Sequence, residues 1–267
     1  MAINLDPTQG ATEQVEDYTG GGGFIWNTGI HEVEITQCYC IVAKSGAQAL
    51  HFRFKDANGK AYKEDLYFTS KTGSYTYDVK DKQKKPTGKK RHIPGFAASA
   101  NIIACAFSDS FSAYIANEEN GADLNERYQN FFFAACASCK PGTVPKWDWP
   151  KKADVDTEVD DVMHNIVGKK INLAIVKKLV NKQEANAEGN YVDVAETREE
   201  NEINNAFSLT GFSAPELLVS AKEPAVMTTW SEANAGKLID KRKIKDQAVP
   251  TAGAPASTAA TTDNIFG

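Results

Sequence analysis

Alternating apolar and polar residues open the patterned part of the chain. In Gly29–Val42, Val33 and Ile35 share one face while glutamates occupy the other. Ala49–Asp56 alternates in the same way, with leucine and phenylalanine opposite histidine, arginine and lysine. After an Asn-Gly turn the pattern continues into Ala61–Thr69. These three segments predict an antiparallel strand meander.

Helical spacing follows further along. Pro94–Phe107 and Leu124–Cys139 carry apolar residues at helical intervals. Glu223–Gly236 predicts a short helix around Trp230, whose ring we expect in the core. Val155–Gly168 is also predicted to be a helix. Acidic residues at its start would interact favourably with the positive end of the helix dipole, and Gly168 would end the helix.

The β pattern then returns. Lys170–Asn181 predicts a strand, the acidic Lys182–Glu202 an extended hairpin tip, and Ile203–Leu209 a closing strand, whereas Lys140–Pro150 predicts a loop. The order of three strands, a helical segment and two further strands is that of an OB-fold. This fold is a five-stranded barrel that binds oligonucleotides on the face of its second and third strands. We therefore expect a mainly β protein, an OB-fold barrel elaborated by helices.

Composition sets the limits of this fold. The chain has 267 residues, 42% of them hydrophobic, and a net charge of -5, which suits a globular protein spanning residues 24–246. Residues 1–23 end in four glycines and predict a flexible lead-in, and residues 247–267 are Pro/Ala/Thr-rich and predict a disordered tail. The absence of a signal-like start, of a long apolar run and of a disulfide framework in the sequence predicts a reduced, cytoplasmic setting without a membrane.

A basic stretch, Lys71–His92, stands out against the acidic whole. It holds eight Lys or Arg and only two Asp. Pro86 and Gly88 predict that most of it is loop. Cations interleaved with Tyr75 and Tyr77 suit a track for backbone phosphates with rings for unstacked bases. A solvated surface loop is the alternative interpretation.

Outward-facing residues of the predicted meander extend this candidate surface. His51, Arg53 and Lys63 lie on the strand 2–3 face, where an ordinary solvent face is the other interpretation. The inward or outward orientation of Tyr67 stays open. Trp26 either stacks on bases or caps the barrel.

Two further tryptophans and four of the five cysteines are explained by packing rather than by ligand binding. We expect Trp147 and Trp149 to cap barrel ends. Cys38, Cys40, Cys136 and Cys139 could supply four thiolates to a tetrahedral zinc ion. The CxxC pair, however, lies in an apolar helix where small thiols are common fillers, and the first pair has CxC spacing, so we predict no metal and no other cofactor.

Several segments in order carry a resemblance to the single-stranded DNA-binding proteins of tailed bacteriophages. The resemblance covers about residues 24–245 and implies an OB-fold that binds single strands without strong sequence preference in phage DNA replication, recombination and repair. It also implies recruitment of replication proteins through an acidic tail, but this tail keeps only an apolar tip, Ile265-Phe266. The segments are GIHEVEITQCYCIVAKSGAQALHFRFKDANGK, LYFTSKTG, HIPGFAASANIIACAF, VGKKINLAIVKKLVNK, NEINNAFSLTGFSAPELL and WSEANAGKLIDKRK.

The sequence therefore predicts a non-enzymatic, single-stranded DNA-binding protein. It does not determine the oligomeric state. Catalysis finds no support: the four histidines are scattered, no nucleotide-binding motif occurs, and Asp160-Asp161 fits a helix start better than a magnesium site. The alternative is a replisome or transcription adaptor whose basic loop docks an acidic protein. The predicted DNA-binding residues are Trp26, His51, Arg53, Lys63, Tyr67, Lys71, Tyr75, Tyr77, Lys80, Lys82, Lys84, Lys85, Lys89, Lys90 and Arg91.

Overall fold

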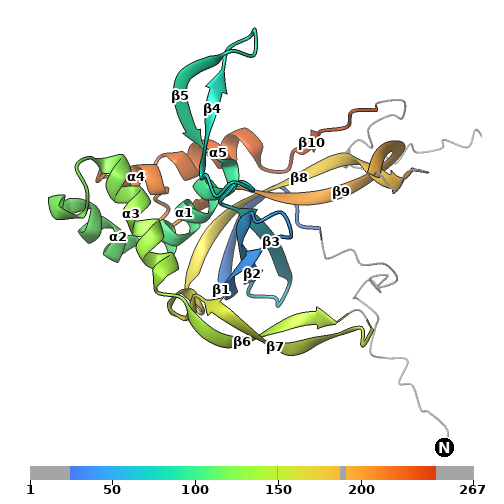
Figure 1. Cartoon of the computed structure of the whole chain (residues 1–267), viewed down its shortest axis with the longest axis horizontal. Helices are drawn as coiled ribbons and strands as arrows, with labels where there is room; N and C mark the ends of the chain where they lie inside the picture. The colour runs from blue at the N-terminus through green and yellow to red at the C-terminus, as the bar shows by residue number, and fades with distance from the viewer. Residues whose placement is uncertain (1–24, 149, 187–190, 245–267) are drawn as a thin grey trace, which may run out of the picture.

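The computed structural model of the chain describes residues 25–148, 150–186 and 191–244. The predicted flexible segment 1–23, the predicted disordered tail 247–267 and Trp149 lie outside the described residues. Figure 1 shows the arrangement of the elements. The strands are β1 (Gly29–Val42), β2 (Gln48–Lys55), β3 (Ala61–Tyr67), β4 (Thr76–Lys80), β5 (Pro86–His92), β6 (Lys140–Asp148), β7 (Ala153–Val162), β8 (Lys170–Ala185), β9 (Tyr191–Phe207) and β10 (Leu238–Asp240). The helices are α1 (Pro94–Ala106), α2 (Ser108–Ala116), α3 (Leu124–Ala137), α4 (Ala214–Leu218) and α5 (Val226–Asn234), with short 3-10 turns η1 (Glu118–Asn120) and η2 (His164–Ile166).

Most strands belong to one sheet, in which β10, β8, β1, β2 and β3 lie side by side in that order. β9 pairs with β8, and the β6–β7 ribbon joins the sheet through a bridge between β7 and β1. The β1–β2–β3 meander is antiparallel, with Tyr39 opposite His51 and Arg53 opposite Lys63. The prediction of a mainly β protein with helical insertions is confirmed.

The predicted closed barrel is not confirmed, because no backbone ladder joins β3 to β9 in the described residues. Side chains bridge these two strands instead. The Tyr62 hydroxyl donates to the Asn201 carbonyl at 3.4 Å and also to the Glu64 carboxylate, while the Ile203 N–H donates to Glu64 Oε2 at 3.2 Å. Burial raises the pKa of the Glu64 carboxyl above its usual range. The β3–β9 seam is thus held by polar side chains rather than by strand pairing.

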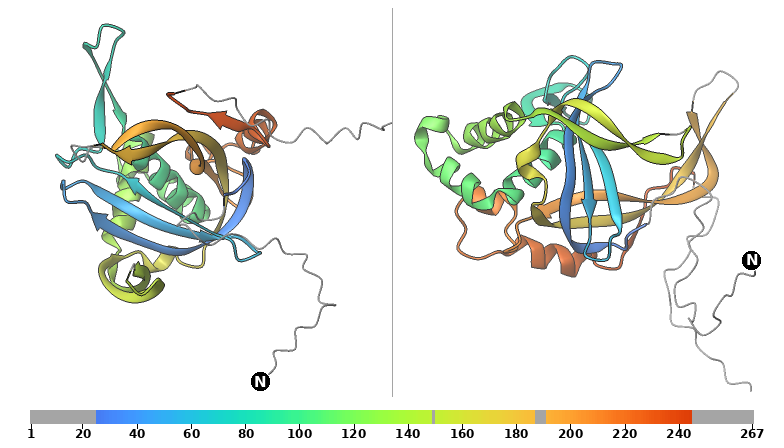
Figure 2. Two further views of the ribbon diagram at one scale, coloured as in Figure 1. Left: turned by 90° about the vertical axis from the view of Figure 1, so that its right-hand side faces the viewer. Right: turned by 90° about the horizontal axis from the view of Figure 1, so that it is seen from below.

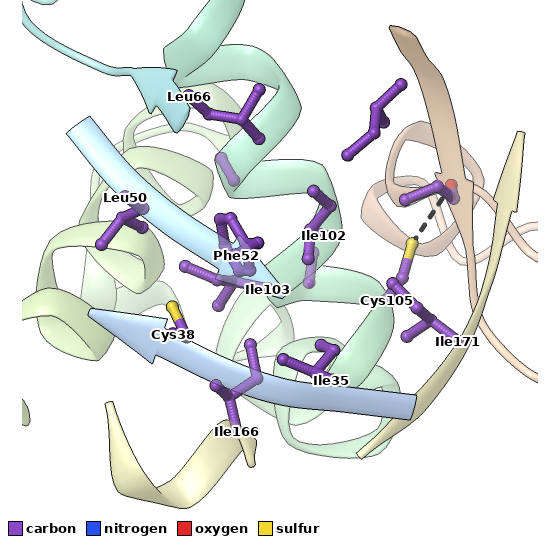
Figure 3. Close-up of a cluster of buried hydrophobic side chains, with 14 of the residues drawn as sticks. Ile35, Cys38, Leu50, Phe52, Leu66, Ile102, Ile103, Cys105, Ile166 and Ile171 are labelled. Carbon is purple, nitrogen blue, oxygen red and sulfur yellow. Dashed lines mark hydrogen bonds between the residues drawn. The ribbon is translucent and has the colours of Figure 1, made fainter. Parts of the chain in front are cut away.

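The core lies between the sheet and α1 (Figure 3). Because side chains alternate along a strand, Ile35 and Phe52 point inward and meet Ile102 and Ile103 of α1. All four are fully buried, and each such side chain contributes about 1.5–3 kcal/mol of transfer free energy. Figure 3 also shows Cys105, whose thiol donates to the Ala206 carbonyl at 3.4 Å and so connects α1 to β9.

Helix α1 begins where its sequence favours a start and sits very close to β3. Pro94 occupies the first turn, where its missing N–H costs nothing. A Cβ at Gly95 would lie 2.1 Å from the Tyr67 carbonyl oxygen, so only glycine permits this approach. The helices predicted at 94–107 and 124–139 are confirmed by α1 and α3, and α1, α2 and α3 gather at one end of the sheet (Figure 2).

Four predictions beyond the meander need correction. The predicted loop Lys140–Pro150 is mostly strand β6, and the predicted helix Val155–Gly168 is strand β7 up to Val162 followed by the turn η2. Acidic residues alternate with Val155, Thr157 and Val159 at the period of a strand. The expected closing strand is the end of the long β9, which pairs with β8 and not with β3. Trp230 is half-buried on α5 rather than in the core, and its indole N–H donates to Asn204 Oδ1.

Candidate nucleic-acid interface

The basic stretch forms a two-stranded hairpin, not the predicted loop. β4 and β5 pair only with each other, and the hairpin projects from the body (Figure 1); we call residues 76–92 the basic arm. Its turn is built on Asp81, whose carboxylate accepts from the backbone N–H groups of Gln83 and Lys85 at 2.9 and 2.8 Å. Lys84 takes a positive φ of 63° there. The sequence signal for this turn was the Asp side chain, which can hydrogen-bond backbone two residues on.

The cations of the arm are open to solvent. Every Lys and Arg between Lys71 and Arg91 is exposed, and none forms an ion pair with another described residue. The lysines of β8 behave differently, since Lys177 and Lys178 pair with glutamates of β9 at 2.6 and 2.8 Å. The positive charge of the arm is therefore available to an outside anion. The residues concerned are Lys71, Lys80, Lys82, Lys84, Lys85, Lys89, Lys90 and Arg91.

Strand pairing sorts the side chains of the arm into two faces. Tyr77 lies opposite Arg91, and Lys89 shares that face because it is two residues away along β5. Asp78 lies opposite Lys90 on the other face. The Tyr77 ring is 45% exposed. One face of the arm thus presents an aromatic ring beside two cations, a combination suited to a base and its flanking phosphates.

Tyr75 anchors the arm rather than extending its surface. Its ring stacks on Phe96 with centroids 5.3 Å apart and meets Phe133 edge-on at the same distance. His92 lies on the other side, 6.1 Å from the Tyr75 centroid, and burial lowers the pKa of its imidazole. Because three rings already surround it, Tyr75 joins the arm to α1 and α3, and its predicted role as a stacking face needs correction.

A cleft of about 640 Å³ opens on the outer face of β1, β2 and β3, beside the β6–β7 ribbon. His51, Arg53 and Lys63 line it, as predicted for the outward positions of the meander. Tyr39, Lys146 and Trp147 line it as well, and sequence reasoning had not placed them in the site. Tyr39 packs with Val144 and Val162 of the ribbon, which fixes the ribbon against β1.

Two of the basic side chains in the cleft, His51 and Arg53, lie against carboxylates, unlike the cations of the arm. His51 Nδ1 lies 2.6 Å from Asp65 Oδ1, and Arg53 Nη1 lies 2.9 Å from Asp154 Oδ2. Lys146 places its ammonium 4.7 Å from the centroid of the Tyr39 ring. A ligand phosphate that approaches His51 or Arg53 must compete with these carboxylates, whereas Lys63 and Lys146, which also line the cleft, have no carboxylate ion-pair partner among the described residues.

The aromatic residues differ from their predicted roles. Trp26 is 1% exposed and packs 4.6 Å from His31, so its ring belongs to the core and is not a stacking face. Trp147, predicted to cap the barrel, is 46% exposed at the cleft. Tyr67 points outward and is 44% exposed, which decides the orientation that the sequence left open. Burial depends on contacts between residues far apart in the sequence. The local sequence therefore gave no sign that Trp26 would be buried and Trp147 exposed.

Four thiols gather where β1 meets the end of α3, but no group of three or more His, Cys, Asp or Glu among the described residues is arranged to hold a metal. Burial raises the pKa of the Cys38 thiol far above its usual range. Burial and the neighbouring thiols Cys139 and Cys40 raise the pKa of Cys136 to about 12. Cys38 is buried, and Cys40, Cys136 and Cys139 are half-buried against the apolar core.

Comparisons of the chain with protein families, with curated proteins and with solved structures found no match. Among the described helices, none is both long and apolar enough to cross a membrane.

Proposed function

We propose that this protein binds single-stranded DNA without sequence preference and serves phage DNA replication, recombination and repair. One observation carries the proposal: eight exposed cations of the basic arm and its base have no ion-pair partner among the described residues, and two of them, Lys89 and Arg91, share a face with the exposed Tyr77. Neutralising backbone phosphates releases counterions, which supplies affinity that does not depend on sequence. Ring stacking adds about 1–3 kcal/mol per base and is equally tolerant of sequence.

The strand order supports an OB-type barrel as the scaffold. β1, β2 and β3 form a meander, a helical segment lies later in the chain, and β8 then returns beside β1 with β9 paired to β8. In OB-folds the face of the second and third strands takes the oligonucleotide, and the cleft lies on that face of β2 and β3. The β3–β9 seam, bridged only by side chains, agrees with the partly open form of such barrels.

The arm and the cleft suggest one path for the bound strand. Lys63 borders the cleft, and Tyr67 lies four residues further along the same face of β3, about 13 Å away. From Tyr67 the chain leads directly into the arm. A strand that enters beside Trp147 can follow Lys63 and Tyr67 toward Tyr77. This path combines stacking rings with phosphate contacts and holds the DNA unpaired without any chemical step.

Competition binding tests the proposal directly. A fluorescent oligo-dT is titrated with the full chain, and unlabelled single-stranded or duplex DNA of equal length then competes. We expect the single strand to compete far better, because the proposed path needs unstacked bases. Equal competition by duplex would refute single-strand binding, and failure to shift oligo-dT would favour the alternative of an adaptor that docks an acidic protein through the arm.

A further inference from the structure

Arg53 and Asp154 form an ion pair between two parts of the chain that are 101 residues apart. Arg53 extends from β2 into the cleft, and Asp154 reaches it from β7. Arg53 Nη1 donates to Asp154 Oδ2 at 2.9 Å, and the two side chains are 32% and 38% exposed. The pair therefore sits inside the proposed DNA path and is open to solvent.

The β6–β7 ribbon does not need this pair to hold its place. Tyr39 packs on Val144 and Val162, and Tyr39 and Val162 are also partners in the strand bridge. Exposed ion pairs contribute little to stability, because solvent screens them and side-chain freedom is lost. A contact with little structural effect in a binding cleft points to a role in binding.

A guanidinium uses the same N–H groups for a carboxylate as for a phosphate. While Asp154 holds Arg53, a phosphate gains that cation only by displacing the carboxylate. Asp156, Glu158 and Asp160 continue the row of exposed carboxylates along β7, two residues apart. When a phosphate displaces Asp154 from Arg53, the Asp154 carboxylate therefore remains beside other negative charges. The ribbon thus opposes phosphate entry at one defined atom pair.

We propose that Asp154 is an intramolecular competitor for phosphate at Arg53 and a determinant of which ligands the cleft accepts. This inference rests on the proposed function. A lone phosphate or mononucleotide offers a single contact and fails to displace Asp154. A long single strand adds stacking at Trp147 and charge contacts on the arm, and these offset the displacement. Asp154 therefore selects polymeric strands over small phosphates.

Two matched variants isolate the effect. Asp154→Asn removes the competitor, and Asp156→Asn removes the same charge from the same exposed row without touching Arg53. Affinity for a fluorescent oligo-dT is measured by anisotropy over a series of salt concentrations. We expect Asp154→Asn to bind up to about fivefold more tightly, the range of an exposed ion pair. The slope of log affinity against log salt should stay nearly unchanged, because a long strand engages the same number of phosphates whether or not Asp154 has first to be displaced from Arg53.

A double-mutant cycle with Arg53→Gln completes the test. If Asp154 acts through Arg53, Asp154→Asn should change neither affinity nor slope beyond the effect of Asp156→Asn once Arg53 is replaced. Equal behaviour of Asp154→Asn and Asp156→Asn with Arg53 present would overturn the inference while leaving DNA binding established. Absence of oligo-dT binding by the parent chain and all variants would instead overturn the proposed function, and this inference with it. Equal melting temperatures confirm that the variants fold.

Discussion

Neutralising the tip of the basic arm should weaken DNA binding and flatten its salt dependence. The variant replaces Lys84, Lys85, Lys89, Lys90 and Arg91 with glutamine. All five side chains are exposed, and none pairs with another described residue. The melting temperature should therefore stay nearly unchanged, which separates lost contact from lost structure.

The geometry of the arm gives the size of the effect. Lys89 and Arg91 share the face of Tyr77, Lys90 lies on the opposite face, and the other two lysines belong to the turn. A strand that follows the Tyr77 face meets both cations of that face and about one lysine of the turn. With about three phosphates engaged and roughly 0.7 per contact on a single strand, the slope of log affinity against log salt should fall by about two.

Salt titration by fluorescence anisotropy measures this slope. A variant with only Lys89→Gln and Arg91→Gln should show about two thirds of the change, whereas Lys90→Gln alone should leave the slope nearly intact. Lys222→Gln with Lys241→Gln removes two exposed charges from outside the arm and should have little effect. An unchanged slope in the five-fold variant would contradict the reasoning and place the DNA on the Arg53 and Lys63 surface alone.

Four further outcomes follow from the same structure. The basic arm, an isolated hairpin, should exchange its amide hydrogens rapidly in the free protein and slowly with oligo-dT bound; strong protection without DNA would contradict this. Glu64→Ala leaves the Ile203 N–H unpaired and should lower the free energy of unfolding by about 1–3 kcal/mol in urea titrations, with Glu64→Gln costing less. Burial raises the pKa of Cys105 and of Cys136 to about 12, so few of these thiols are thiolates at pH 8. Iodoacetamide should therefore label the thiols of the native protein slowly, and faster as the pH rises. A chelator should not change the melting temperature. Deleting Gln247–Gly267 should leave oligo-dT affinity and melting temperature intact and remove at most a protein partner; a large loss of stability would show that the tail packs on the sheet.

Local pattern alone determined the meander and the main helices. The alternation in Gly29–Val42 and Ala49–Asp56 depends only on neighbours two residues apart, so the faces of β1 and β2 could be predicted from sequence. The same holds for α1, with its proline start and helically spaced apolar residues. The alternation in β7 was equally visible, but its carboxylates were interpreted as the start of a helix.

Only the tertiary structure decided which surfaces are open and which charges are free. Trp26 is buried because its ring packs on His31 at the start of β1 and on Tyr62 of β3, and its backbone N–H donates to Asn201 of β9. Trp147 is exposed because its ribbon packs through other residues. The cations of the arm project away from the body, while Arg53 meets a carboxylate that is 101 residues distant in sequence. Burial and ion pairing depend on what the fold brings close in space, and no local pattern of side chains encodes that proximity.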